Sequence, residues 1–138
     1  MNTPDTTFAP QQSQPRILIV DDDPSVSSVM GQVLEVLGYS SSTCGDPAEA
    51  VAQFRDGSFD VLLTDYRMPA MNGIELSQQV RKCNASVPII LMSGYHPTME
   101  ENEMHLSPFD MILEKPIEME SLDRAIKSTL QSNKSNCY

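Results

Sequence analysis

The sequence predicts an α/β fold: a doubly wound, five-stranded parallel sheet with strand order 2-1-3-4-5 and helices on both faces. From Arg16 onward, five short strand-like runs alternate with longer helix-like stretches, and parallel neighbours need such crossover connections. The runs, for example residues 17–20 and 61–63, are apolar without alternating, as in strands that are buried on both faces. In such folds ligands bind at the carboxyl ends of the strands.

The individual elements follow from local sequence. Strands are expected at 16–20, 39–43, 59–64, 87–92 and 109–113, and helices at about 24–37, 47–56, 73–83, 98–106 and 118–130. Asp23-Pro24 and Asp46-Pro47 each offer an N-cap oxygen followed by a proline at the first helical position. Gly38 lies where a helix C-cap would fall, directly before the second strand.

The chain is expected to form one domain over residues 16–130. Its 138 residues are enough to bury a core without disulfides or a structural metal. Residues 1–15, rich in Gln, Pro, Thr and Ser, are expected to be a disordered leader. The apolar face of the last helix ends at Leu130, so residues 131–138 are expected to be a frayed tail. Because no effector domain follows residue 130, we expect a stand-alone domain.

Composition excludes several classes of partner. The net charge of −10 and the pI near 4.4 argue against direct binding to nucleic acid or to an anionic membrane. A basic or neutral protein surface, or a divalent cation, fits better. The three widely spaced cysteines form no metal-ligand pattern and no disulfide framework, which indicates reduced thiols in the cytoplasm. No export signal or membrane-spanning run is visible in the sequence.

Charged and hydroxyl side chains follow four of the predicted strands. Asp21 and Asp22 follow the first strand, Asp65 the third, Ser93 the fourth and Lys115 the fifth. Strands 1 and 3 are neighbours in the predicted order, so their acids should converge into an oxygen-only pocket that suits Mg²⁺ or Mn²⁺. With a cation, a lysine and a hydroxyl nearby, the third of these carboxylates could attack phosphorus and form an aspartyl phosphate.

Four motifs carry a resemblance to a known family. They are Ile-Leu-Ile-Val-Asp-Asp-Asp-Pro, Leu-Leu-Thr-Asp-Tyr-Arg-Met-Pro-Ala-Met-Asn-Gly, Ile-Leu-Met-Ser-Gly-Tyr and Leu-Glu-Lys-Pro. In this order and spacing, over residues 16–130, they resemble the receiver domain of two-component response regulators. The resemblance implies a flavodoxin-like (βα)5 fold. It also implies a protein that catalyses its own phosphorylation and dephosphorylation, and is not a turnover enzyme on a separate substrate.

The resemblance assigns the metal site. It implies that Asp65 is the phosphoacceptor and that Asp22 is a direct Mg²⁺ ligand. Asp21 would reach the metal through water, and the backbone carbonyl of Arg67 would complete the protein ligands. A cis bond before Pro116 is also implied.

The resemblance also assigns the phosphoryl contacts and the output. Ser93 would bind the phosphoryl group and move toward it, and Lys115 would contact a phosphoryl oxygen. The signal would reach the face formed by helix 98–106, strand 109–113 and helix 118–130. The phosphoryl donor would be a histidine kinase, a histidine phosphotransfer protein or a small molecule such as acetyl phosphate. The downstream protein target is not identified by the sequence.

The chain departs from the family pattern in two places. Many receivers carry Tyr or Phe three residues before the lysine, where this chain has Ile112. Tyr95 or a backbone shift would then report activation instead. The segment 99–108 contains several Glu residues and Pro108 where receivers often have an Ala-rich helix, so a short or mobile helix is expected there.

Three alternatives remain open at this point. A phosphorelay intermediate or phosphate sink would use the same chemistry as an output regulator. A haloacid-dehalogenase-like phosphatase would use Asp21 as nucleophile and Asp23 as acid, but this leaves Asp65 unexplained. A pseudo-receiver would bind partners without being phosphorylated, and it predicts a missing acid, hydroxyl or lysine, none of which is missing.

Overall fold

The computed structural model describes residues 15–56, 59–68, 71–94 and 109–135. Its sheet has five parallel strands in the order β2-β1-β3-β4-β5, which confirms the predicted fold class and strand order. The strands are β1 (Arg16–Val20), β2 (Ser40–Cys44), β3 (Val61–Asp65), β4 (Ile89–Ser93) and β5 (Met111–Glu114). The helices of the described residues are α2 (Pro24–Leu37), α3 (Pro47–Arg55), α4 (Gly73–Cys83) and α6 (Met119–Ser135).

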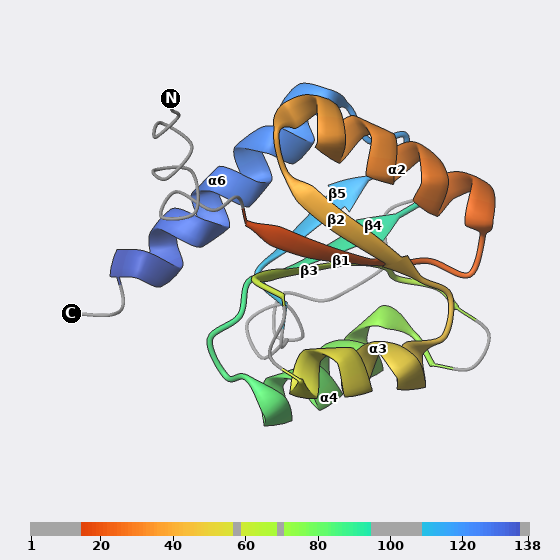
Figure 1. Ribbon diagram of the computed structural model, residues 1–138, viewed down its shortest axis with the longest axis vertical. Helices are drawn as coiled ribbons and strands as arrows, with labels where there is room; N and C mark the ends of the chain where they lie inside the picture. Colours follow the sequence, from red (N-terminus) through yellow and green to blue (C-terminus); the bar gives the residue numbers. More distant parts are fainter. Residues whose placement is uncertain (1–14, 57–58, 69–70, 95–108, 136–138) are drawn as a thin grey trace, which may run out of the picture.

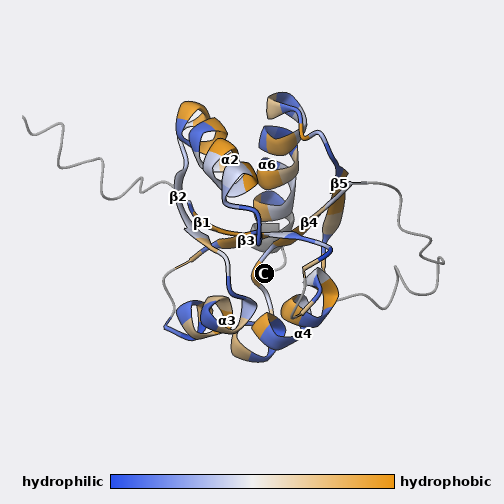
Figure 2. Ribbon diagram, turned by 90° about the vertical axis from the view of Figure 1, so that its right-hand side faces the viewer, coloured by the Kyte–Doolittle hydropathy of each residue, from blue (hydrophilic) through white to orange (hydrophobic). Residues whose placement is uncertain are grey.

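The molecule has three layers. Figures 1 and 2 show α2 and α6 on one face of the sheet and α3 and α4 on the other. Alternate side chains of the strands therefore enter two separate cores. The core under α2 and α6, the α2/α6 core, contains Ile17, Ile19, Met30, Leu34, Val61, Leu63, Ile90, Met92, Leu122, Ala125 and Ile126. The core under α3 and α4, the α3/α4 core, contains Leu18, Val20, Cys44, Ala50, Phe54, Leu62, Met68, Leu76, Val80, Val87, Ile89, Leu91 and Phe109.

The helix ends are set by short-range chemistry. The Asp23 carboxylate accepts from the backbone N–H of Ser25 at 2.9 Å, and Asp46 does the same for Ala48 at 3.0 Å. Gly38 ends α2 with φ of 94°, in the left-handed region that glycine enters without strain. Both caps and the glycine stop match the sequence prediction.

The element bounds differ from the prediction in detail. Strands β3, β4 and β5 each begin two residues later than expected. Phe59, Val87 and Phe109, which opened the expected strands, pack against the α3/α4 core from the loops before them. Helix α6 continues to Ser135, beyond the expected end of the domain at residue 130. The apolar spacing stops at Leu130, but neither proline nor glycine follows before Ser135 to end the helix.

Two expected features lie outside the described residues. These are the helix at 98–106 and nearly all of the leader at 1–15. Among the residues that are described, no helix is both long and apolar enough to cross a membrane.

Candidate functional site

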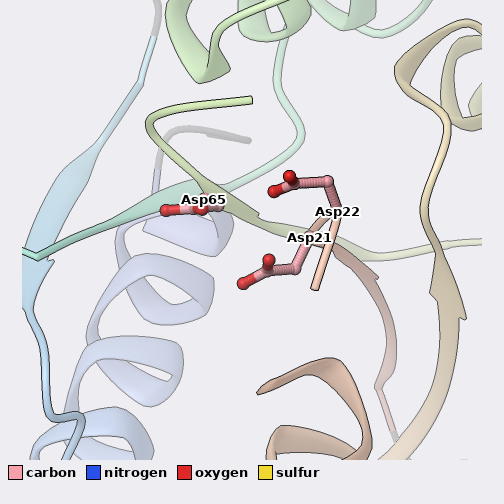
Figure 3. Close-up of side chains that lie close together, drawn as sticks. All are labelled: Asp21, Asp22 and Asp65. Atoms are coloured by element: carbon pink, nitrogen blue, oxygen red, sulfur yellow. The ribbon is translucent and has the colours of Figure 1, made fainter. Parts of the chain in front are cut away.

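Three carboxylates meet at the carboxyl ends of two adjacent strands. Asp21 and Asp22 directly follow β1, and Asp65 is the last residue of β3. The two strands pair in parallel, with Val20 opposite Thr64, so the acids leave the sheet side by side. One carboxylate oxygen from each of the three lies within 4.8 Å of the others, and Figure 3 shows the side chains gathered where the strands end.

A turn at the start of α2 orients Asp21. Its Oδ1 accepts from the backbone N–H of Asp23 at 2.9 Å, and Asp23 in turn caps the helix. The other oxygen, Asp21 Oδ2, is buried and has no hydrogen-bond partner among the described residues. A buried carboxylate oxygen without a hydrogen bond is expensive to maintain. The Lys115 ammonium, 3.5 Å away, offsets part of that cost as an ion pair.

Lys115 lies against the acids from the end of β5. Its Nζ is 3.2 Å from Asp65 Oδ1 and 3.5 Å from Asp21 Oδ2. The backbone N–H of Lys115 donates to the carbonyl of Ser93 at 2.7 Å, which places the lysine beside β4. The peptide bond between Lys115 and Pro116 is cis, the isomer that the family resemblance implies. Lys115 thus contacts two of the three carboxylates, and its single positive charge does not balance all three.

The pKa of Asp21 reflects its burial and the charged groups around it. Burial raises this pKa above its ordinary value, and the neighbouring Asp65 carboxylate raises it further. The Asp23 amide and the Lys115 ammonium lower it, but they offset only part of the loss of water. The folded protein therefore holds a carboxylate that is less stable as an anion than it would be in water.

The donor set fits a hard divalent cation. All three side-chain donors are carboxylate oxygens, which Mg²⁺ and Mn²⁺ prefer over softer ligands. Asp21 Oδ2, which accepts no hydrogen bond from the described residues, is the atom that a cation, or a water bound to one, would satisfy. Arg67 lies two residues beyond Asp65, and its backbone carbonyl remains the further candidate ligand that the family resemblance implies.

The remaining predicted residues are distributed as follows. Ser93, 5% exposed, ends β4 and directly follows Met92, the residue that pairs with Asp65. Ile112 lies in β5 opposite Leu91 and packs, partly buried, against the α3/α4 core. Tyr95 lies outside the described residues.

The segment that follows Asp65 is held by two contacts that sequence reasoning did not identify. The buried Thr64 hydroxyl donates to the Asp65 carbonyl at 3.1 Å. Gly73, the first residue of α4, donates from its N–H to the Tyr66 carbonyl at 2.7 Å. A Cβ on Gly73 would lie 2.6 Å from the Asp65 carbonyl oxygen. Two sequence features could have indicated these contacts: a hydroxyl residue within an apolar strand, and a glycine at the first position of a helix.

Comparisons with known proteins agree on one family. The family model described as "Response regulator receiver domain" matches residues 17–127. The C4-dicarboxylate transport transcriptional regulatory protein DctD of Pseudomonas aeruginosa is 31% identical, over 90% of this chain and 27% of its own length. The DNA-binding response regulator MtrA of Mycolicibacterium smegmatis is 30% identical, over 86% of this chain and 51% of its own length. The chain thus spans between about a quarter and half of these two relatives.

A solved structure supports the same assignment. The CheY-like response regulator receiver domain protein from Methanospirillum hungatei JF-1 superposes with a TM-score of 0.80 and 29% identity. The match covers 90% of this chain and 99% of that one.

Proposed function

The chain belongs to the response regulator receiver domain family, and from this premise we propose that it is a phosphorylation-controlled switch with Asp65 as its phosphoacceptor. The family acts in two-component signalling and is not a class of turnover enzymes. The observation that carries the assignment of Asp65 is its contact with Lys115, at 3.2 Å, beside the other two acids.

The proposed reaction is transfer of a phosphoryl group to a carboxylate oxygen of Asp65. That oxygen forms a bond to phosphorus as the bond to the donor breaks, and the donor nitrogen or oxygen leaves with the electron pair. A bound Mg²⁺ would be held by Asp21, Asp22, Asp65 and the Arg67 carbonyl. It would supply positive charge to balance the negative phosphoryl oxygens.

Two of the chain's own residues would stabilise the transferred group. Lys115 already lies within reach of Asp65 and would move its ammonium to a phosphoryl oxygen. The Ser93 hydroxyl would donate to another of these oxygens. Each is expected to bind the product more tightly than the free carboxylate, which favours the phosphorylated state.

The donor and output are proposed as follows. A histidine kinase or a histidine phosphotransfer protein would supply the phosphoryl group in the cytoplasm. The signal would leave, toward a protein target, through the face that includes β5 and α6. The helix expected at 98–106, which the family resemblance also assigns to this output face, lies outside the described residues. A relay or phosphate-sink role uses the same site. The DNA-binding role named for MtrA is a property of that longer relative.

The test is to locate the phosphate directly. The protein is incubated with acetyl phosphate and Mg²⁺, and the modified residue is mapped by mass spectrometry. We expect modification of Asp65, none in Asp65→Asn, and normal labelling in Asp23→Asn, since Asn can cap α2 as well as Asp does. Beryllofluoride with Mg²⁺ should shift the NMR signals of residues near Asp65.

Two outcomes would contradict the proposal. Phosphate mapped to Asp21, together with loss of labelling in Asp23→Asn, would favour the haloacid-dehalogenase-like phosphatase. No labelling and no response to beryllofluoride, in folded protein with saturating Mg²⁺, would favour a pseudo-receiver.

A further inference from the structure

Thr64 is a polar residue in an apolar place. Its side chain is fully buried, and its partners on the two neighbouring strands, Val20 and Leu91, both belong to the α3/α4 core. Valine has the same shape and would bring no hydroxyl into this core. A buried hydroxyl is unfavourable unless it is hydrogen-bonded, so the bond that Thr64 makes is the feature to explain.

That bond holds the peptide group directly after Asp65. The Thr64 hydroxyl donates to the Asp65 carbonyl at 3.1 Å. On the other side of the same peptide, the Tyr66 N–H donates to the Met92 carbonyl at 2.8 Å. Both ends of the Asp65–Tyr66 peptide are therefore anchored, one to a side chain of β3 and the other to β4.

Gly73 restrains the next peptide along the chain. Its N–H donates to the Tyr66 carbonyl at 2.7 Å, and its Cα lies so close to the Asp65 carbonyl that a Cβ would be 2.6 Å from the oxygen. The backbone directly after β3 is thus held at two successive carbonyls, those of Asp65 and Tyr66. Arg67, whose carbonyl is a candidate metal ligand, follows immediately.

We propose that Thr64 is a positioning residue for the cation site, because its hydroxyl fixes the Asp65–Tyr66 peptide and thereby sets the direction of the Asp65 carboxylate and of the Arg67 carbonyl. The proposal rests on the proposed function for the identity of the cation. Rotation of this peptide would move both ligands together. Small displacements of ligating or reacting groups have large effects on binding and rate.

The experiment compares three variants in the full chain. Thr64→Val removes the hydroxyl and keeps the shape, and Thr64→Ser restores the hydroxyl. Thr129→Val is the matched control, since the buried Thr129 hydroxyl also donates to a backbone carbonyl, that of Ala125 at 2.9 Å in α6, far along the sequence from the site. Mg²⁺ affinity is measured by NMR titration, and urea unfolding confirms that each variant is folded.

We expect Thr64→Val to bind Mg²⁺ about 10-fold more weakly, the size of effect seen when a residue that orients a metal ligand is removed. Thr64→Ser should recover most of the affinity, and Thr129→Val should match the wild type. In metal-free protein, the Tyr66 amide should exchange its hydrogen faster in Thr64→Val than in Thr64→Ser. Thr64→Ala provides a second hydroxyl-free variant that cannot overpack the core.

Unchanged Mg²⁺ affinity in both Thr64→Val and Thr64→Ala would overturn the inference, as would an equal loss in Thr129→Val. Failure of the proposed function gives a different pattern. In that case wild-type Asp65 would take no phosphate, while the Mg²⁺ affinities and the metal-free exchange of the Tyr66 amide would still separate the Thr64 variants.

Discussion

Replacement of Gly73 by alanine tests how closely α4 approaches the end of β3, where Asp65 lies. The added Cβ would lie 2.6 Å from the Asp65 carbonyl oxygen, 2.9 Å from Leu91 Cδ2 and 3.1 Å from Tyr66 Cα. The leucine methyl can move aside, but the other two atoms belong to the backbone of the site. Helix α4 must therefore shift away from β3 or the Asp65 carbonyl must turn.

The expected loss of stability follows from two opposing effects. Overpacking of a filled site costs about 1–3 kcal/mol. Alanine is favoured over glycine inside a helix by at most about 1 kcal/mol, and less at the first helical position. The balance predicts that Gly73→Ala is destabilised by about 1–2 kcal/mol, equal to a fall of several degrees in the melting temperature.

Gly31→Ala is the matched control. Gly31 lies inside α2, and the nearest atom to its added Cβ would be Ser41 Oγ at an ordinary 3.8 Å. This variant should gain up to about 1 kcal/mol. Both are measured by urea unfolding followed by circular dichroism, and phosphorylation by acetyl phosphate should slow only in Gly73→Ala. If Gly73→Ala is as stable as the wild type and labels at the same rate, the close approach does not constrain the site.

Three further predictions concern charge and pH. Asp21→Asn should raise the melting temperature of the metal-free protein, because it removes a buried carboxylate whose pKa is raised by burial. The same variant should be stabilised less by added Mg²⁺. A melting temperature below that of the wild type in EDTA would contradict this. Lys115→Met should lower the melting temperature in EDTA, since the ammonium lies between Asp21 and Asp65. Added Mg²⁺ should reduce the difference in melting temperature between this variant and the wild type. An equal difference with and without Mg²⁺ would refute the reasoning. Tyr39→Phe removes the 2.7 Å bond from the Tyr39 hydroxyl to Asp123, and its deficit in unfolding free energy should be widest between about pH 4 and pH 10. The pKa of Asp123 is lowered by hydrogen bonds from Lys127 and Tyr39, so its contribution to the free energy of unfolding disappears as pH falls. The pKa of Tyr39 is raised by burial and by Asp123, so its contribution disappears as pH rises. A loss of unfolding free energy in Tyr39→Phe that is constant with pH would rule this out.

The sheet was predictable because its strands are short, apolar and separated by clear helix signals. Strand β2, Ser-Ser-Ser-Thr-Cys, is the exception in composition. It was predicted from its position after Gly38 in the alternating pattern, and it lies at the edge of the sheet, where polar side chains can reach solvent. The end of α6 was missed because apolar periodicity marks the buried face of a helix and not the last residue of its backbone.

The convergence of Asp21, Asp22 and Asp65 was predictable from topology alone, because the carboxyl ends of neighbouring parallel strands share one edge. Two features were not predictable: the Asp21 Oδ2 without a hydrogen bond, and the contacts of Thr64 and Gly73 with the backbone after Asp65. These features depend on which rotamer a side chain adopts and on how near a helix comes to a strand. Neither quantity is encoded in residue spacing.

The two cores on opposite faces of the sheet have a thermodynamic consequence. Leu76 belongs to the α3/α4 core and Leu122 to the α2/α6 core, and the sheet backbone separates them. Truncations at sites that share no contacts are additive to within about 0.3–0.5 kcal/mol. Sequence drift in one layer would then leave the energetics of the other almost unchanged. A lineage could therefore remodel the side that carries α6 while the layer formed by α3 and α4 stays as it is.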